Sequence, residues 1–491
     1  FQANKKTIIG AIIGGYNSKW TMTAHNDMQI YKNHIQDTSI TITNTELNQW
    51  KNIMANVNLQ HNFSERKTLS VDLDYLYYSD NNPNNYSDSY YNGGGNFLYG
   101  ELTRSGKITP INTWVGKADY LVKLGKKINY EGGIKATVSK FTNEVDVSKF
   151  QSNNWVADKL LSAKYILNED VQAAYSTISI AYNEKINIKM GLRYEYTNSN
   201  LSTTTTKNIV DRHYGKLFPS FFMSHKINDN NGLNVSYSKR ITRPTFNNLA
   251  PFTIFLDPNT FFTGNAALQP SFTDEIKLDY TFKKNIVSLG YSIENNSIAE
   301  FQPSVDIATN KQYVTAENLI NVKIVSLSLS LPFNIAKWWT VQNNFIGAWE
   351  QINTINKNLP LQLQQVIFNF NSSHSFTLPK EYSMEVSGFY DAGGLFGTSV
   401  YKPLGALNFG LQKKLKGNRG KLRFAVTDIL KTISYKTIVD RPSEYFYTRS
   451  DYNFSQRIFK LTFTKNFGSK SLKEKRERAT ASEEERLRVK T

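Results

Sequence analysis

The chain has 491 residues, a formal net charge of +17 and no cysteine. The lack of cysteine excludes a disulfide framework and any thiolate metal site. The basic residues are scattered rather than gathered in one block, which disfavours a nucleic-acid-binding stripe and favours attraction to anionic head groups or solutes. No stretch approaches the ~20 consecutive apolar residues that a membrane-spanning helix requires.

The first elements in the chain are predicted to be β-strands. Residues 7–16 are expected to form a strand that ends at a tight turn near Tyr16-Asn17. The chain starts at Phe1 without an initiator Met or a signal peptide, so we expect a truncated or processed N-terminus. A second strand alternates apolar Leu69, Val71, Leu73, Tyr75 and Tyr77 with polar Ser70, Asp72 and Asp74.

The clearest alternation covers residues 186–196. Apolar and aromatic residues on one parity are Ile186, Ile188, Met190, Leu192, Tyr194 and Tyr196, and the other parity holds Asn187, Lys189, Gly191, Arg193 and Glu195. A period of two is typical of a β-strand whose faces lie in different environments. The pattern recurs at 233–238, 276–282, 325–331 and 459–464. Because an ordinary core would exclude these charges, we expect one face in lipid and the other in a wet lumen.

Short and long connections alternate between these strands. Short, turn-forming segments lie near Tyr16-Asn17, 63–67, 125–127, 183–185, 228–231, 283–285, 332–337, 379–381 and 416–420. Longer polar segments cover 79–109, 143–164, 198–212, 244–271, 299–313 and 432–452. This asymmetry is typical of an up-and-down membrane barrel with short periplasmic turns and long extracellular loops.

The fold class that follows is all-β, a transmembrane antiparallel up-and-down β-barrel over residues 1–468. We count about 19 strands, each near the ~9–11 residues of a tilted crossing. If the last strand, 452–467, runs inward, strand 7–16 also runs inward, so an odd number of strands is missing. A barrel of about 22 strands would lack about three at its N-terminal side. Residues 469–491 are charged and are expected to form a solvated periplasmic tail, either a short helix or disordered.

The densest motif runs from Ser238 to Tyr280 and contains four prolines, at 244, 251, 258 and 270. Proline restricts φ and removes a donor, so it favours an ordered loop between two strands. The parity of Arg240 points it into the lumen. Lys239 and Arg243 share the lipid-facing parity, and at the outer end of their strand they are expected to snorkel toward head groups.

This motif resembles the signature of the TonB-dependent-receptor-like outer membrane β-barrel family of Gram-negative bacteria. The residues that carry the resemblance are Ser238, Arg240, Arg243, Pro244, Leu249, Pro251, Phe252, Asp257, Pro258, Gly264, Asn265, Leu268, Pro270, Glu275 and Tyr280. Segments 191–197, 217–229 and 426–430 and the charged tail also resemble the family, so the resemblance covers essentially the whole chain. Ala250 departs from it, where the family usually has Asn.

The resemblance implies an outer-membrane receptor for active uptake of a small solute. In such receptors an N-terminal plug fills the barrel, and a short box at its start engages a periplasmic energy-coupling protein. Neither the plug nor the box is visible in this sequence, which would supply the wall, the lumen and the ligand-facing loops. The implied surroundings are outer-membrane lipid and lipopolysaccharide, with the C-terminus in the periplasm.

Two other functions stay open at this point. One is a passive outer-membrane channel or structural scaffold, and the other is a soluble secreted β-rich adhesin or lectin. Lys189, Arg193 and Arg240 are the candidate ligand-binding residues, because basic lumen side chains favour an anionic solute. The same residues are also expected to pair with the lumen carboxylates Glu195, Asp72 and Asp279, and this second interpretation is favoured.

Motifs of catalysis are not found. No GxSxG, P-loop or dinucleotide-binding motif occurs, and the six histidines show no HxH or HxxxH spacing. A lipase-like use of Ser372, Ser373 and His374 is disfavoured, and 80–88 is interpreted as a solvated loop rather than a calcium site. We therefore expect neither an enzyme nor a cofactor.

Overall fold

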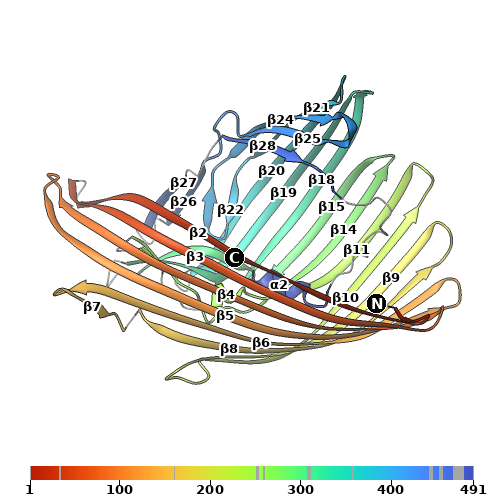
Figure 1. Ribbon diagram of the computed structural model, residues 1–491, viewed down its shortest axis with the longest axis horizontal. Helices are drawn as coiled ribbons and strands as arrows, with labels where there is room; N and C mark the ends of the chain where they lie inside the picture. Colours follow the sequence, from red (N-terminus) through yellow and green to blue (C-terminus); the bar gives the residue numbers. More distant parts are fainter. Residues whose placement is uncertain are drawn as a thin grey trace.

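The computed structural model describes residues 2–32, 35–159, 161–249, 254–257, 260–306, 311–356, 359–441, 446–452, 457–467 and 480–489. Most of them belong to one curved antiparallel sheet, which bends into an open-ended wall (Figure 1). The predicted all-β antiparallel architecture is confirmed.

The wall strands follow one another in chain order, and each pairs antiparallel with the next. They are β2 (Thr7–Lys32), β3 (Ile35–Ser64), β4 (Lys67–Asn92), β5 (Phe97–Leu124), β6 (Ile128–Gln151), β8 (Ala163–Ala181), β9 (Ile186–Thr203), β10 (Val210–Lys226), β11 (Asn231–Thr242), β14 (Ser271–Phe282), β15 (Asn285–Asn295), β18 (Asn321–Ala336), β19 (Trp339–Asn356), β20 (Leu359–Leu378), β21 (Tyr382–Asp391), β24 (Leu404–Leu415), β25 (Gly420–Thr427) and β28 (Ile458–Thr464). The short strands β1 (Gln2–Asn4) and β7 (Asn154–Ala157) pair with β2 and β6 and complete a 20-stranded sheet.

Two small sheets and three short helices lie outside this wall sequence. One sheet consists of β12 (Ile254–Asp257), β13 (Thr260–Phe262), β16 (Ile298–Asp306) and β17 (Lys311–Asn318), and the other of β22 (Gly394–Phe396), β23 (Ser399–Tyr401), β26 (Tyr435–Arg441) and β27 (Phe446–Tyr452). The helices are α1 (Phe246–Leu249), α2 (Glu483–Val489) and the 3-10 turn η1 (Lys416–Asn418). In the described part of the chain, the helices are too short and too polar to cross a bilayer.

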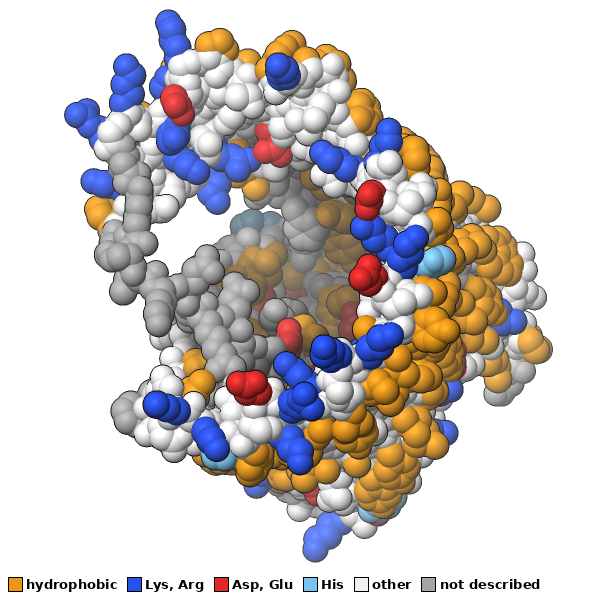
Figure 2. Space-filling model, turned by 90° about the vertical axis from the view of Figure 1, so that its right-hand side faces the viewer, with side chains coloured by type: hydrophobic (Ala, Val, Ile, Leu, Met, Phe, Trp, Pro, Cys, Tyr) orange, Lys and Arg blue, Asp and Glu red, His pale blue; other side chains and the backbone are white. Residues whose placement is uncertain are grey.

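The two faces of the wall differ as the alternation predicts. In β9, Leu192 is 50% exposed on the outer face, whereas Glu195 is 6% exposed on the concave face. Ile13, Val366 and Leu461 are among the apolar side chains exposed outside. Figure 2, which looks into the hollow, shows hydrophobic side chains gathered on the outer surface. Such a continuous apolar exterior argues against a soluble adhesin, because water-soluble monomers do not expose patches of this extent.

Most of the predicted tight turns are confirmed. The chain turns as expected between β3 and β4, β5 and β6, β8 and β9, β10 and β11, β14 and β15, β20 and β21, and β24 and β25. The turn predicted at 332–337 lies slightly later, because β18 stays paired until Ala336 meets Trp339. These short connections gather at one end of the wall, and we call it the short-connection end.

The predicted turn at Tyr16-Asn17 is wrong. Both residues lie inside β2, where Tyr16 pairs with Asn52 and Asn17 pairs with Lys51. The Asn17 side chain finds a partner without bending the backbone, since Gln49 Nε2 donates a hydrogen bond to Asn17 Oδ1 at 3.2 Å. Asparagine therefore sits in an extended ladder here rather than in a turn.

Several predicted long loops are continuations of the wall. In the segment 79–109, the β4–β5 ladder runs from Ser79 opposite Pro110 to Tyr90 opposite Tyr99. Beyond the lipid both faces of a strand are wet, so polar residues on both parities are compatible with the same backbone pairing. Of the long connections, 244–271 contains α1, β12 and β13 as short elements among its described residues.

The strand directions differ from the predicted ones at the N-terminal side. Thr7 pairs with His61 at the short-connection end, so β2 runs away from that end rather than toward it. The short β1, antiparallel to β2, runs toward it. At the other edge Thr464 pairs with Lys421, so β28 returns to the short-connection end. Among the described residues, β2 and β28 are not paired with each other, and the strand number of the whole barrel stays a prediction.

The two faces of β9 are expected to respond oppositely to an added charge. Leu192→Arg places a guanidinium on the outer face and should lower the free energy of unfolding by about 2–4 kcal/mol near the bilayer midplane. Asn187→Arg, on the concave face of the same strand, should change it by less than about 1 kcal/mol. Urea unfolding in lipid vesicles measures both, and equal effects would contradict the assignment of the faces.

Candidate functional site

The concave face of β9 carries two of the predicted ligand-binding residues. Lys189 and Arg193 both lie on this face, on the parity of Glu195. Lys189 is exposed near the short-connection end, where its backbone pairs with Ser179 and Phe222. Arg193 lies further along the strand and takes part in a buried charge cluster. The two residues therefore occupy different environments.

Glu195 is the centre of that cluster. Its Oε1 is 2.5 Å from Arg193 Nε and its Oε2 is 2.6 Å from an Arg243 guanidinium nitrogen. Arg243 also donates to Thr197 Oγ1 at 3.2 Å. A buried carboxylate is costly unless it is paired, and here two guanidinium groups share it.

The lipid-facing position predicted for Arg243 is wrong. Its side chain is only 13% exposed and points to the concave side, where it meets Glu195. The physical reason is that β11 ends at Thr242, so the parity of the strand no longer governs the next residue. Lys239 remains within β11 and pairs with Asp274 at 3.0 Å.

Arg240 is separate from the Glu195 cluster. It forms an ion pair with Glu275 on the adjacent strand β14, and its side chain is 60% exposed. Arg193 and Arg240 thus each have a carboxylate partner, and Lys277 pairs with Asp279 at 3.0 Å. The ligand-binding role of Lys189, Arg193 and Arg240 stays a prediction, and the geometry shows no point at which the three converge.

The connection between β11 and β14 is held together by Asn265. Its Nδ2 donates to the Ala316 carbonyl at 3.0 Å, and its Oδ1 accepts from the Ala267 amide at 2.9 Å. Its own amide donates to the Asn248 carbonyl at 2.6 Å. The side chain therefore links the following turn to β17, and the main-chain amide of the same residue links both to α1. This gives a physical reason for an asparagine in the motif.

Other motif residues contribute less or lie outside the described part. Pro251 and Pro258 fall outside the described residues, and only the backbone of Asp257 is described, within β12. Pro270 is buried just before β14, and the Gly264 carbonyl accepts a hydrogen bond from Thr263 Oγ1 at 3.3 Å. Arg212, which the sequence did not single out, donates to the carbonyls of Ala267, at 2.7 Å, and Leu268.

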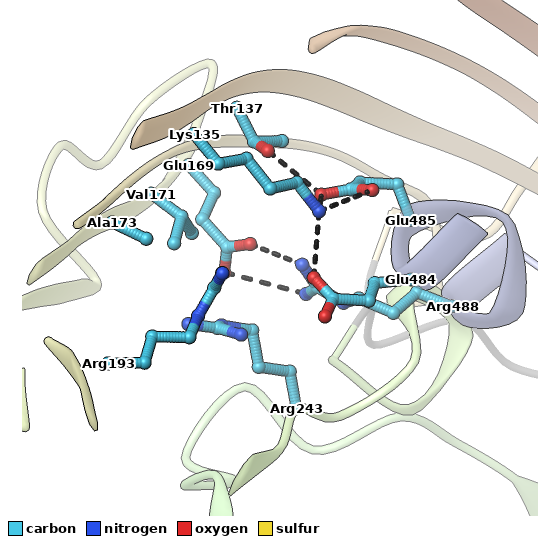
Figure 3. A pocket seen from close by; sticks show the side chains of 10 residues that line it. All are labelled: Lys135, Thr137, Glu169, Val171, Ala173, Arg193, Arg243, Glu484, Glu485 and Arg488. Atoms are coloured by element: carbon cyan, nitrogen blue, oxygen red, sulfur yellow. Dashed lines mark hydrogen bonds and ion pairs between the residues drawn. The ribbon is translucent and has the colours of Figure 1, made fainter. Parts of the chain in front are cut away.

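The C-terminal segment does not behave as the solvated tail that its charge predicts. Its described part, 480–489, contains α2, which lies against the concave face (Figure 3). Lys135 Nζ is 2.7 Å from Glu484 Oε2 and 2.9 Å from Glu485 Oε1. A helix was one of the two expected forms of this tail, and its placement inside the wall was not foreseen.

The wall forms a shallow seat for α2. Ala173 of β8 lies between Lys135 and Glu195 in the cross-strand row, so a small side chain separates two charged ones. Arg488 pairs with Glu169 of β8, and the space left over is a cavity of about 30 Å³. Lys135 and Glu169 are charged residues in the middle of their strands, at positions whose side chains face the concave side. These charges are the one signal in the sequence that could have indicated this seat.

Ser372 and His374 lie together, but in the wrong arrangement for catalysis. Ser372 Oγ is 3.2 Å from His374 Nε2, and Trp339 Nε1 is 3.2 Å from His374 Nδ1. Because the indole N–H only donates, Nδ1 must accept and Nε2 must carry the hydrogen. Ser372 then donates to Asn343 Oδ1, at 2.7 Å. The histidine is therefore not available as a base for the serine.

No metal centre is found among the described residues, where no group of three or more His, Asp or Glu side chains is placed to hold an ion. The segment 80–88 is also not the solvated loop that the sequence predicts. It belongs to β4, and Asp80 is 1% exposed and pairs with Lys107 at 2.8 Å.

Asn265→Ala is expected to loosen the β11–β14 connection. The change leaves the Ala316 carbonyl and the Ala267 amide without their partner, at about 1–3 kcal/mol for each group that stays buried. Limited proteolysis of the folded protein should cut this connection several-fold faster. Asn265→Asp keeps the acceptor for Ala267 and should fall between, whereas unchanged proteolysis in both variants would contradict this role of Asn265.

Docking of α2 is expected to weaken in acid. Partial burial raises the pKa of Glu484. The positive charges of Lys135 and then of Arg193 and Arg243 lower it by more, so the pKa of Glu484 lies below its ordinary value. Glu485, Glu169 and Arg488 face the same seat. Because the pKa of Glu484 is lower when α2 is docked, the ionised carboxylate stabilises docking above about pH 4.5. This stabilisation is lost as the pH falls through the lowered pKa. Amide hydrogen exchange of residues 483–489, corrected for intrinsic rates, should stay slow from pH 7 to about 5 and become faster at lower pH. Faster exchange when the pH is raised would contradict this prediction.

Comparison with solved structures finds matches at very low sequence identity, and the shared fold rests on OprC. The copper transporter OprC is 10% identical over 88% of this chain and 75% of its own, with a TM-score of 0.52. The ferric yersiniabactin uptake receptor FyuA from Yersinia pestis is 9% identical over 93% of this chain and 78% of its own, with a TM-score of 0.49. A search of curated proteins finds no match.

The family is shown by a sequence model rather than by these structures. Residues 61–464 match the model of the outer membrane protein beta-barrel family, which is most of the chain. This agrees with the apolar exterior and the polar concave face. The predicted outer-membrane β-barrel is thereby confirmed, and the chain belongs to the outer membrane protein beta-barrel family.

Proposed function

We propose that this chain is the barrel of an outer-membrane receptor and transporter of the TonB-dependent type. The observation that carries the proposal is that chain segments occupy the concave side: α2 and the β11–β14 connection pack against each other and against the wall. A lumen partly occupied in this way supports a gated path over an open pore. The shared fold of OprC, described as a copper transporter, supports the same class.

The solute would bind first at the long connections, where aromatic rings are exposed. Phe301 is 58% exposed, stacks on Phe396 at 6.4 Å and meets Phe262 edge-on at 5.7 Å between ring centroids. Its φ of 54° is a left-handed conformation that a bulky residue rarely adopts. Strain of this kind persists only where the surroundings hold it, and it is often found at binding sites.

Gln302 supplies that restraint. It is 1% exposed, and its Oε1 accepts from the Thr398 amide at 2.8 Å. Its Nε2 donates to the Glu300 carbonyl at 2.7 Å and to the Phe396 carbonyl at 3.3 Å. The buried amide thus ties β16 to the β22–β23 turn and holds Phe301 and Phe396 as one platform.

The partners follow from the same proposal. The outer face would contact membrane lipid and lipopolysaccharide, and a plug domain would connect the lumen to a periplasmic energy-coupling protein. The short-connection end, to which β28 returns, would face the periplasm and hold the C-terminal side of the chain. The solute itself is a small molecule whose identity depends on the long connections.

A passive channel is the second candidate, because the wall surrounds a hollow. Single-channel recording in planar bilayers with KCl separates the two. A gated receptor should be closed for most of the recording, with rare brief openings. Steady conductance of the unaltered protein would overturn the receptor proposal and favour the channel, and detergent without protein is the control.

A further inference from the structure

The contact between α2 and the wall is made by charges of opposite sign. Lys135 of β6 meets Glu484 and Glu485, and Thr137 Oγ1 donates to Glu485 Oε1 at 2.8 Å. At the start of the segment the Ser482 amide donates to Asp74 Oδ2 of β4 at 2.8 Å. Two wall strands that lie far from α2 in the sequence, β4 and β6, therefore hold this short helix, and Figure 3 shows the contacts from β6.

Arg488 extends this contact to the β11–β14 connection. Its guanidinium pairs with Glu169 on the wall and also lies 3.3 Å from the Pro244 carbonyl oxygen. It lies 4.5 Å above the ring of Phe246, which stacks on Phe141 of β6 at 5.2 Å. One side chain thus contacts the wall, the start of the connection and the aromatic ring between them.

The end of α2 is apolar and completes a buried cluster. Val489 is 5% exposed and packs in the same cluster as Phe246, Leu249 and Leu268, all three from the connection. Leu487, two residues earlier, is 61% exposed. The helix therefore inserts one defined edge between the wall and the connection.

The seat depends on α2 for its charge balance. Among the described residues, the ion-pair partners of Lys135 are Glu484 and Glu485, and that of Glu169 is Arg488. Both wall side chains are 7% exposed. With α2 in place these two charges are buried and need partners of opposite sign. Glu484, Glu485 and Arg488 supply those partners, so the seat is complementary to this particular segment.

We propose that the concave wall carries a peptide-binding site for the chain's own C-terminal segment, 482–489, and that this segment clamps the β11–β14 connection to β6 and β8. The ligand class is a short peptide with two adjacent carboxylates, an arginine three to four positions later and an apolar end. Release of the peptide removes the Arg488 and Val489 contacts and loosens the connection against β6 and β8, while the Arg243–Glu195 ion pair still joins it to β9. This inference does not depend on transport.

Because the sequence contains no native cysteine, a thiol reagent labels only the cysteine that is introduced. Single-cysteine variants of the full chain are purified in detergent and compared in two pairs, each with one buried and one exposed position. One pair reports docking of α2, and the other reports whether the β11–β14 connection is held. Val489→Cys is buried and Leu487→Cys exposed on α2, while Leu268→Cys is buried and Ala267→Cys exposed in the connection. We expect maleimide to label each buried position at least about ten-fold more slowly than its exposed neighbour.

Arg488→Glu is the releasing variant and Leu487→Glu the control. Both place a new carboxylate on α2, but Arg488 pairs with a wall carboxylate, whereas the Leu487 side chain is 61% exposed. Arg488→Glu should speed labelling at both Val489→Cys and Leu268→Cys about ten-fold, with Ala267→Cys unchanged. Leu487→Glu should alter these rates less than about two-fold. Glu169→Gln repeats the release from the wall side, and heat-modifiable gel migration shows that each variant is folded.

Two results would overturn the proposal. Equal labelling of Val489→Cys and Leu487→Cys in the unaltered chain means that α2 is not docked. Release of Val489→Cys by Arg488→Glu with Leu268→Cys still protected means that α2 docks without clamping the connection. Both proposals start from α2 docked on the concave face, but labelling measures docking, whereas the bilayer recordings measure whether the path is closed. Failure of this proposal and failure of the receptor proposal are therefore distinguishable.

Discussion

A backbone inside hydrocarbon must satisfy its own hydrogen bonds, and this single constraint shapes the whole molecule. A strand can do so only by pairing on both sides, which requires a continuous antiparallel sheet that curves around a lumen. The alternation of side chains then follows, since each strand has one face toward lipid and one toward water. In β9 this is visible as Leu192 on the outside and Glu195 within.

On the concave face, charged side chains lie close to one another and partly away from water, which is unfavourable unless they are paired. In this structure they are paired with charges of opposite sign. Glu195 is shared by Arg193 and Arg243, Lys135 and Glu169 take partners from α2, and the result is a cluster balanced in sign. The segments that fold inward are therefore held by the wall's electrostatics as well as by apolar packing, as Val489 illustrates.

The sequence predicts the wall well and the interior poorly, for physical reasons. Period-two patterning and turn chemistry are local, so the faces of β9 and most short turns are correct. Asn17 shows the limit, since its turn propensity is overruled by a ladder that gives its amide a partner. The long β4–β5 hairpin was missed because polar strands outside lipid carry no hydrophobic signal. Arg243 and α2 depend on contacts between distant segments, which no local pattern encodes.

The long sequence separation between α2 and the strands that hold it has a consequence for the order of folding. The contacts of this segment with Lys135 and Asp74 join residues separated by 349 and 408 positions, so they are among the most non-local in the molecule. Contacts of such high sequence separation form late, since the loop between them must close first. The seat for α2 exists only after β4, β6 and β8 have curved together. Docking of α2 is therefore a final step that only a correctly curved wall permits.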